Sequence, residues 1–249
     1  MSLPGRGEAP YTDGVPGDRD MEMEEHLIEL AKRFLFVFAV VGVVTILAYP
    51  VSDEMIEMFI QDFVPEGIRI ITLHPVEIVF TKLEVAVAIS LLAGAPLIIY
   101  EAFAFMKPGL FPSERRFYLT VVPTSFILFV AGAAFSYRFL IPRLSTALIG
   151  TSTATTTPLL VLSRLMDFIT FMLVVVGAVF QVPLVIHLLI KMDLVEPSFL
   201  RDNRKYIYLL LFFIVNLFNP DPSMATPFVI TAGFILLYEV SLRLFARGR

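Results

Sequence analysis

Long apolar runs separated by charged segments constrain the fold of this chain more than any other feature. A helix needs about 20 predominantly apolar residues to cross a bilayer, and most of the runs reach that length with their flanks. Hydrophobic residues make up 57% of the chain and charged residues 17%. The mean hydropathy is +0.80, which a water-exposed globular surface does not tolerate. The runs cover residues 34–49, 76–102, 117–137, 168–190, 206–218 and 227–245. The sequence therefore predicts an all-α membrane protein with six transmembrane helices, the last two of them short.

The last two runs leave an alternative open. The run 206–218 holds 13 residues, which is about 20 Å of helix against a hydrocarbon layer of about 30 Å. On length alone, this run and the next form either two short spans or a re-entrant pair. Either arrangement returns the chain to the side on which it began.

The segments outside the runs have characters of their own. Residues 1–25 are rich in Gly, Pro, Asp and Glu and are expected to form a disordered acidic tail, which leaves 26–249 as the transmembrane domain. The segment Asp53–Val64 has apolar residues at helical spacing with acidic residues opposite. This pattern predicts an external amphipathic helix after the first span. The segment Phe103–Arg116 combines proline, glycine and aromatic residues, which predicts a rigid loop at the membrane interface.

The distribution of basic residues predicts the orientation. With six crossings, 14 of the 19 Lys and Arg residues fall on the side that holds both chain ends. The other side has only Arg69, Lys82, Arg138, Arg143 and Arg164. Cytoplasmic segments carry the excess of Lys and Arg, and Asp and Glu contribute little to this rule. Both termini are therefore expected in the cytoplasm.

Composition and motifs exclude several classes of function. The chain has no cysteine, and its three histidines, His26, His74 and His187, lie far apart without the spacing of metal ligands. A net charge of -4 and a pI of about 5.4 argue against binding to nucleic acid. No nucleophile motif, zinc motif or phosphate-binding glycine loop occurs. The sequence predicts no enzyme, no metal and no cofactor.

Polar residues at particular depths remain as candidates for function. Glu29 lies in an amphipathic lead-in to the first span, where an ordinary solvated face is the simpler interpretation. Gln181 lies within the fourth span, where its amide can contact a partner helix or make an ordinary interhelical hydrogen bond. His187 is interpreted as a packing or interfacial histidine. From the residues alone, a small-solute or ion transporter and a membrane-embedded enzyme stay open, although neither the repeats of a transporter nor a nucleophile and base are visible.

Six short motifs carry a family resemblance. In chain order they are HLIELAKR, PLIIYEAFAFMKPGLFPSERR, FSYRFLIP, VFQVP, FLRDNRKY and NPD. With this order and spacing the chain resembles TatC, the receptor subunit of the twin-arginine protein translocase, over about residues 25–245. The second motif is the most specific of the six.

The resemblance implies a fold and a function. TatC proteins have six spans with cytoplasmic ends, two of them short, which agrees with the topology above. They bind the twin-arginine signal peptide of folded cargo at the cytoplasmic face of the cell membrane. With TatA-like and TatB-like single-span subunits they form a hetero-oligomer among the membrane lipids, which moves folded proteins across the membrane with the proton-motive force.

The resemblance also implies roles for single residues. Glu29 and Glu114 match the acidic residues that contact the arginine pair, and Phe105 matches an aromatic residue of that site. The chemistry fits, because a guanidinium prefers a carboxylate that it can bind through two hydrogen bonds. Tyr137 and Asp221 match family positions on the outer side, for which a partner-helix contact or a structural role is expected, as for Gln181.

The chain departs from the family pattern at three positions. Ala31 stands where the family usually has arginine, Gln181 where it usually has glutamate, and Ala225 near a usual glutamine. A glutamine in place of the glutamate removes a charge but keeps hydrogen bonding.

Reporter fusions test the predicted topology. The expected result follows from the distribution of Lys and Arg and is measured with reporters active on only one side of the membrane. Fusions after Gly67, Thr155 and Pro222 are expected to report outside, and fusions after Pro112, Asp202 and Arg249 inside. An inside signal at Thr155 would contradict the topology, because the third and fourth spans would no longer form a pair.

Overall fold

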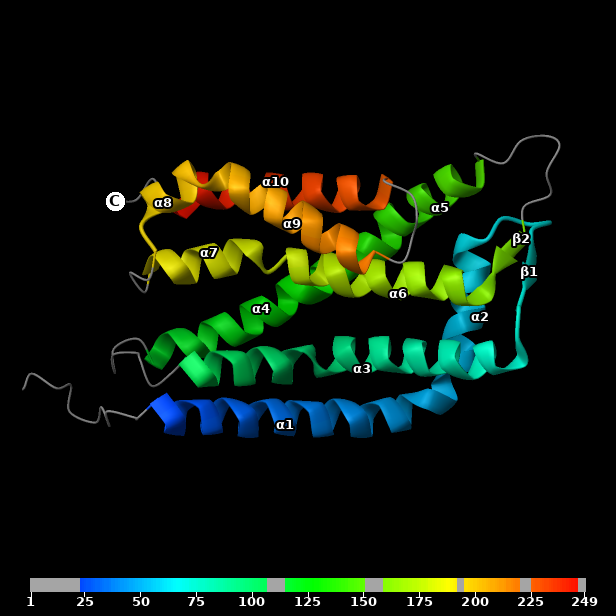
Figure 1. The fold of residues 1–249 in the computed structure, drawn as a ribbon, viewed down its shortest axis with the longest axis horizontal. Coiled ribbons are helices and arrows are strands. Elements are labelled where there is room, and N and C mark those ends of the chain that lie inside the picture. The colour runs from blue at the N-terminus through cyan, green and yellow to red at the C-terminus, as the bar shows by residue number, and fades with distance from the viewer. Residues whose placement is uncertain (1–22, 107–114, 151–158, 192–194, 220–224, 246–249) are drawn as a thin grey trace, which may run out of the picture.

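The computed structural model describes residues 23–106, 115–150, 159–191, 195–219 and 225–245, which are almost entirely helical (Figure 1). The long helices are α1 (Met23–Ala48), α3 (Pro75–Met106), α4 (Arg115–Phe135), α6 (Leu162–Val179), α9 (Arg204–Phe218) and α10 (Ala225–Phe245). The shorter helices are α2 (Ser52–Phe63), α5 (Ile141–Gly150), α7 (Val182–Lys191) and α8 (Pro197–Asp202). α1 includes the last three residues of the expected acidic tail, 23–25, and residues 1–22 lie outside the description.

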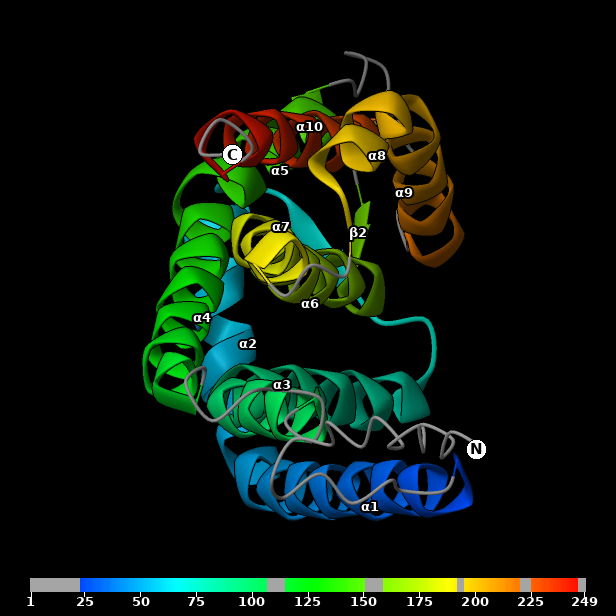
Figure 2. The same cartoon turned by 90° about the vertical axis from the view of Figure 1, so that its left-hand side faces the viewer.

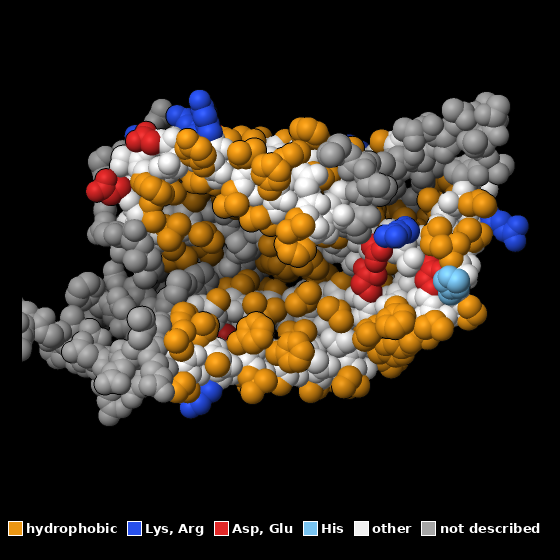
Figure 3. All heavy atoms as spheres, in the orientation of Figure 1, with side chains coloured by type: hydrophobic (Ala, Val, Ile, Leu, Met, Phe, Trp, Pro, Cys, Tyr) orange, Lys and Arg blue, Asp and Glu red, His pale blue; other side chains and the backbone are white. Residues whose placement is uncertain are grey.

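Five helical stretches of the described chain are long and apolar enough to cross a membrane. They are Leu27–Phe63, Pro75–Ala102, Val121–Ala147, Leu162–Lys191 and Ala225–Leu244. The surface between the two ends of the molecule is largely apolar (Figure 3). On α1, Phe34, Ile46 and Leu47 are at least 70% exposed. Water would solvate such a surface poorly, whereas lipid chains cover it without cost. The chain is therefore a multi-pass membrane protein.

The helices lie side by side with their ends in two groups. α1 packs against α3, and α3 contacts α4 and α6 (Figures 1 and 2). α10 lies against α7 and α9. The first turn of α1, the end of α3 and the last turn of α10 gather at one end of the molecule, which we call the terminal end (Figure 1). The helix α2 and the strands lie at the opposite end.

The last two helices differ in length. α9 has 15 residues, about 23 Å, and falls short of the hydrocarbon thickness of about 30 Å. α10 has 21 residues, about 32 Å, so the expectation that it is short is wrong. Arg204 and Tyr208 of α9 bind Glu239 Oε1 of α10 at 3.2 and 2.7 Å. These bonds hold the short helix against the longer one.

Helices occupy part of the expected loop between the second and third spans. α3 continues to Met106 and α4 begins at Arg115, so the prediction of a loop over 103–116 is wrong at both ends. Residues 103–106 contain no glycine or proline that would end α3 earlier. Residues 107–114, which include Glu114, lie outside the described residues.

Prolines shape the third and fourth spans. After α4 the chain passes through a π turn, Ser136–Leu140, into α5, and Pro142 in the first turn of α5 has no N–H for the carbonyl of Arg138. α6 and α7 are separated at Phe180 and Gln181. There Pro183 leaves the carbonyl of Val179 without its helical donor. A missing donor therefore accompanies both irregularities, although α3 and α4 continue through Pro96 and Pro123.

The segment predicted to form an external amphipathic helix is helical as α2, and its position on the outer side of the membrane stays a prediction. Its apolar side, with Ile56, Phe59 and Phe63, is buried in the main hydrophobic core. On its other side, Asp53 forms an ion pair with Lys82 of α3 at 2.7 Å. α2 therefore packs across the ends of other helices, and its apolar side is directed into the protein.

A small sheet corrects the expectation of an all-α fold. Strands β1 (Arg69–Ile71) and β2 (Leu159–Val161) pair in parallel, with Arg69 opposite Leu159. Glu77, in the first turn of α3, accepts hydrogen bonds from the backbone N–H groups of Leu73 at 2.6 Å and Ser163 at 3.2 Å. This carboxylate joins the start of α3 to the start of α6 and holds the two strands together. Three-residue strands carry no periodicity that a sequence reading can detect.

Packing between α4 and the α6–α7 junction depends on a glycine. A Cβ at Gly132 would lie 2.8 Å from Phe180 Cγ and 2.9 Å from the carbonyl oxygen of Val176. At Gly42 of α1, a Cβ would meet no atom within 4 Å. The two glycines are therefore a matched pair for a substitution test.

We expect Gly132→Ala to destabilise the protein and Gly42→Ala to leave its stability equal or higher. Overpacking costs about 1–3 kcal/mol, which exceeds the gain of about 0.5–1 kcal/mol from replacing a helical glycine by alanine. Thermal unfolding in detergent, followed by circular dichroism, measures the difference. An unfolding midpoint for Gly132→Ala at or above that of Gly42→Ala would contradict the close approach.

Candidate functional site

Arg33 joins two carboxylates at the terminal end of the molecule. It lies one helical turn after Glu29, so the two side chains share a face of α1. Arg33 Nε and Nη2 both donate to Glu29 Oε1, at 3.0 and 2.6 Å. Nη1 donates to Glu101 Oε2 of α3 at 2.7 Å. One guanidinium therefore connects α1 to α3.

The cluster of Glu29, Arg33 and Glu101 is mostly shielded from solvent. The side chain of Glu29 is 23% exposed, that of Arg33 28% and that of Glu101 15%. Charges at such depth are screened less than surface charges. Glu29 Oε2 is fully buried and has no hydrogen-bond partner among the described residues. With two carboxylates and one guanidinium, the cluster keeps one excess negative charge, and Glu29 Oε2 is a buried acceptor without a partner among the described residues.

The predicted site residues on α3 lie at the same end. Phe105 is half-buried and follows Glu101 by one helical turn, so the two share a face of α3. Glu114 belongs to the segment outside the described residues. The structure thus places Glu29 and Phe105 at the terminal end. It adds Glu101 and Arg33, to which the sequence reading gave no role.

The cluster suits a cationic ligand with several N–H donors. A carboxylate accepts a guanidinium best through two parallel hydrogen bonds, one to each oxygen. Glu29 offers a free oxygen beside the one that Arg33 occupies. A metal ion is a poorer fit, since among the described residues no three His, Cys, Asp or Glu side chains lie close enough to share one.

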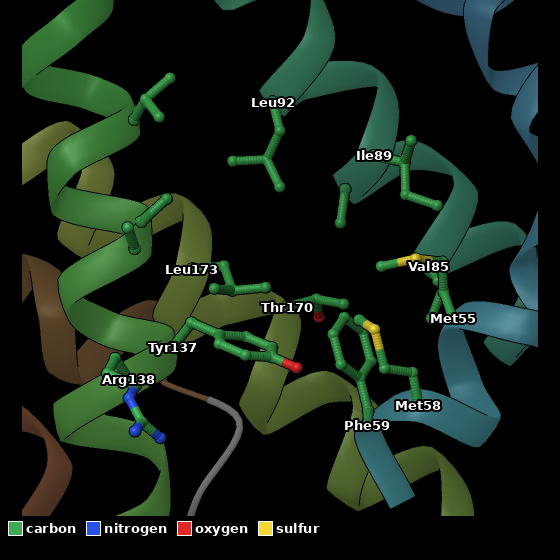
Figure 4. Close-up of a pocket in the computed structure, with 14 residues that line it drawn as sticks. Met55, Met58, Phe59, Val85, Ile89, Leu92, Tyr137, Arg138, Thr170 and Leu173 are labelled. Carbon is green, nitrogen blue, oxygen red and sulfur yellow. The ribbon is translucent and has the colours of Figure 1, made fainter. Parts of the chain in front are cut away.

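Tyr137 has a structural position at the opposite end. Its hydroxyl donates to Asp62 of α2, and its ring lies 5.0 Å from that of Phe63, edge to face. Tyr137 also lines an apolar cavity of about 510 Å³ between α2, α3, α4 and α6, with Phe59 and Leu92 (Figure 4). These contacts fix α2 to the third span and support the structural alternative for Tyr137. Asp221 lies outside the described residues.

Gln181 makes its hydrogen bonds within the chain. Its Oε1 accepts a hydrogen bond from the hydroxyl of Ser125 on α4. Its Nε2 donates to the backbone carbonyl of Ser125 at 3.1 Å. Both bonds cross from the α6–α7 junction to α4, which supports the structural alternative. A contact with a partner helix stays a prediction.

A signal in the sequence could have identified Glu101 as a candidate site residue. It is an acidic residue near the end of an apolar run, one turn before Phe105, and acidic residues within a span usually have a function or a partner. Its pairing with Arg33 depends on the register of α1 against α3, which the sequence does not reveal.

Comparisons with known proteins agree on one family. The profile described as TatC, Sec-independent protein translocase protein, matches residues 25–232. A Sec-independent protein translocase protein TatC from Methanocella arvoryzae is 36% identical over 227 residues, which cover 91% of this chain and 94% of that protein. The TatC of Carboxydothermus hydrogenoformans is 28% identical over 225 residues, which cover 90% of this chain and 93% of that protein.

A solved structure supports the same relationship. It is described as the crystal structure of the twin arginine translocase receptor TatC, and it matches with a TM-score of 0.80 and 26% identity. The match covers 89% of this chain and 98% of that one. The similarity therefore extends over nearly all of the described fold.

The hydrogen bonds between Gln181 and Ser125 can be tested by a double-mutant cycle. We expect Gln181→Leu to lower the free energy of unfolding by about 1.2 kcal/mol, because it removes two interhelical hydrogen bonds that average about 0.6 kcal/mol each in a membrane. Adding Ser125→Ala should then cost nothing more, because its partner is already absent. Unfolding in detergent measures all four proteins of the cycle. Strictly additive losses would contradict a direct bond.

Proposed function

The chain belongs to the TatC family of Sec-independent protein translocase proteins, and from this premise we propose that it binds twin-arginine signal peptides through Glu29, Glu114 and Phe105. It is a transport component, and the family's function is translocation. The chain's role is to receive folded cargo by its signal peptide and help move it across the membrane.

The observation that carries the proposal is the guanidinium already held at the terminal end. Glu29 and Glu101 bind Arg33 through three hydrogen bonds of 2.6–3.0 Å. Carboxylates that hold an internal arginine at this depth have the spacing and charge to hold one from a peptide. Lysine is a compact charge without the planar fork, so it replaces arginine poorly at such a site.

The orientation and the partners complete the proposal. The terminal end faces the cytoplasm of a cell membrane, in line with the excess of Lys and Arg on the side of the chain ends. α9 then makes the fifth of six crossings and keeps both ends on one side. Single-span TatA-like and TatB-like subunits are the expected partners, and the proton-motive force is the expected energy source.

A transporter for small solutes or ions is the less supported reading. The two relatives cover 91% and 90% of this chain and are translocase proteins by name. The matching solved structure is that of a receptor. The acidic cluster at the end of the spans suits a peptide that arrives from solution.

Peptide binding tests the proposal directly. We expect Glu29→Gln and Glu114→Gln each to weaken binding of a twin-arginine signal peptide by about tenfold or more, because each removes a charge-assisted contact worth about 1.5–3 kcal/mol. Binding is measured with the purified protein in nanodiscs. The same substitutions should matter little for a peptide in which both arginines are lysine.

The control for this test is Glu66→Gln. Glu66 is an exposed acidic residue in the loop after α2, at the opposite end of the molecule. The substitution Glu66→Gln removes the same charge far from the site and should leave peptide binding unchanged. Parent-like affinity of both Glu29→Gln and Glu114→Gln would refute the assignment of the site, although the family would stand.

A further inference from the structure

We propose that Arg33 is an internal competitor that occupies the peptide's place on Glu29, and that Glu101 retains Arg33 when the peptide binds. The inference rests on the proposed function, because it concerns the same site. Glu101 becomes a further residue of the receptor, and Arg33 the group that sets its affinity.

The contact between Arg33 and Glu29 uses only part of what a carboxylate offers. Two N–H groups of Arg33 converge on the single atom Glu29 Oε1. The strongest arginine–carboxylate contact instead uses both oxygens, one for each N–H group. Glu29 Oε2 remains buried without a partner. An incoming guanidinium that engages both oxygens therefore gains a bond that Arg33 does not make.

Glu101 gives Arg33 a second anchor. Nη1 of Arg33 donates to Glu101 Oε2 at 2.7 Å, independently of the bonds to Glu29. When a peptide arginine takes Glu29, Arg33 can keep this bond and need not become an unpaired buried cation. Without Glu101, release from Glu29 would leave the Arg33 charge uncompensated at a depth where it is only 28% exposed. The second carboxylate thus makes the exchange feasible.

The exchange also favours arginine over lysine. A lysine ammonium is a point charge that cannot bind both oxygens of Glu29 as a planar fork does. It would have to displace Arg33 without gaining the second bond. A peptide guanidinium is therefore able to displace Arg33 from Glu29, whereas a peptide ammonium is not.

Removing the competitor should strengthen binding. We expect Arg33→Gln to tighten a twin-arginine peptide by about tenfold, as a charge-assisted contact no longer has to be broken. Lys32→Gln is the matched control, since the exposed neighbour carries the same charge on the same turn of α1. Its effect should stay within about twofold, the range of a surface charge. Isothermal titration in nanodiscs measures both variants.

The role of Glu101 is tested in combination. Glu101→Gln alone should weaken peptide binding several-fold, because Arg33 then has only Glu29 and competes harder for it. In the Arg33→Gln background, Glu101→Gln should change little. An equal loss in both backgrounds would show that Glu101 acts independently of Arg33 and would overturn its retaining role.

Arg33→Lys is a second variant that tests the competitor role if Arg33→Gln does not fold. It keeps the charge, loses the bridge between Glu29 and Glu101, and should also tighten the peptide, though less. Thermal unfolding identifies variants that are folded. Binding that weakens, or that only equals the Lys32→Gln control, in the folded Arg33 variants would overturn the competitor. Parent protein that binds no peptide would instead refute the proposed function, so the two failures are distinguishable.

Discussion

The hydrocarbon core offers no water to a polar group, and the architecture of this protein depends on that constraint. A polar side chain within a span is stabilised by a partner on a neighbouring helix or on its own backbone, although the hydroxyls of Thr81, Ser145 and Thr231 have no such partner among the described residues. The hydroxyl of Thr45 in α1 meets that of Ser90 in α3 at 2.8 Å, and the hydroxyl of Ser136 donates to the carbonyl of Met172 in α6 at 3.0 Å. Each bond fixes a register between two helices whose apolar surfaces alone would allow several. The shape of the molecule thus follows from a few polar side chains as much as from the apolar ones.

The same constraint explains what the sequence could predict. Runs of apolar residues imposed by the bilayer identified the long helices, and helical spacing identified α2. The features that escaped prediction depend on contacts between segments far apart in the chain. The parallel pairing of Arg69 with Leu159 and the approach of Gly132 to Phe180 both require the fold to exist first. Hydropathy predicts which segments are helical, but it does not predict which helices pack against one another.

In the candidate site, too, the sequence predicted individual residues but not the contacts between distant segments. Glu29 and Phe105 were predicted because they stand in motifs whose meaning the family resemblance supplies. The hydrogen bond from Arg33 to Glu101 could not be predicted, because 68 positions separate the two residues and only the packing of α1 on α3 brings them together. An acidic residue near the end of an apolar run signals a partner or a function. It does not say which basic residue will be that partner.

A receptor for a cationic peptide at the edge of a membrane faces two opposed demands. Carboxylates that are partly withdrawn from water bind a guanidinium strongly, yet when vacant each would bear a desolvation penalty of up to several kcal/mol. Arg33 offsets that penalty by binding Glu29 and Glu101 itself. On the proposal that Arg33 competes with the peptide, the peptide gains only the excess of its contact with both oxygens of Glu29 over the contact of Arg33 with one, so we expect a moderate affinity. Moderate affinity suits a receptor that has to release each cargo after transport, and it follows here from placing an arginine one turn away from the carboxylate that it blocks.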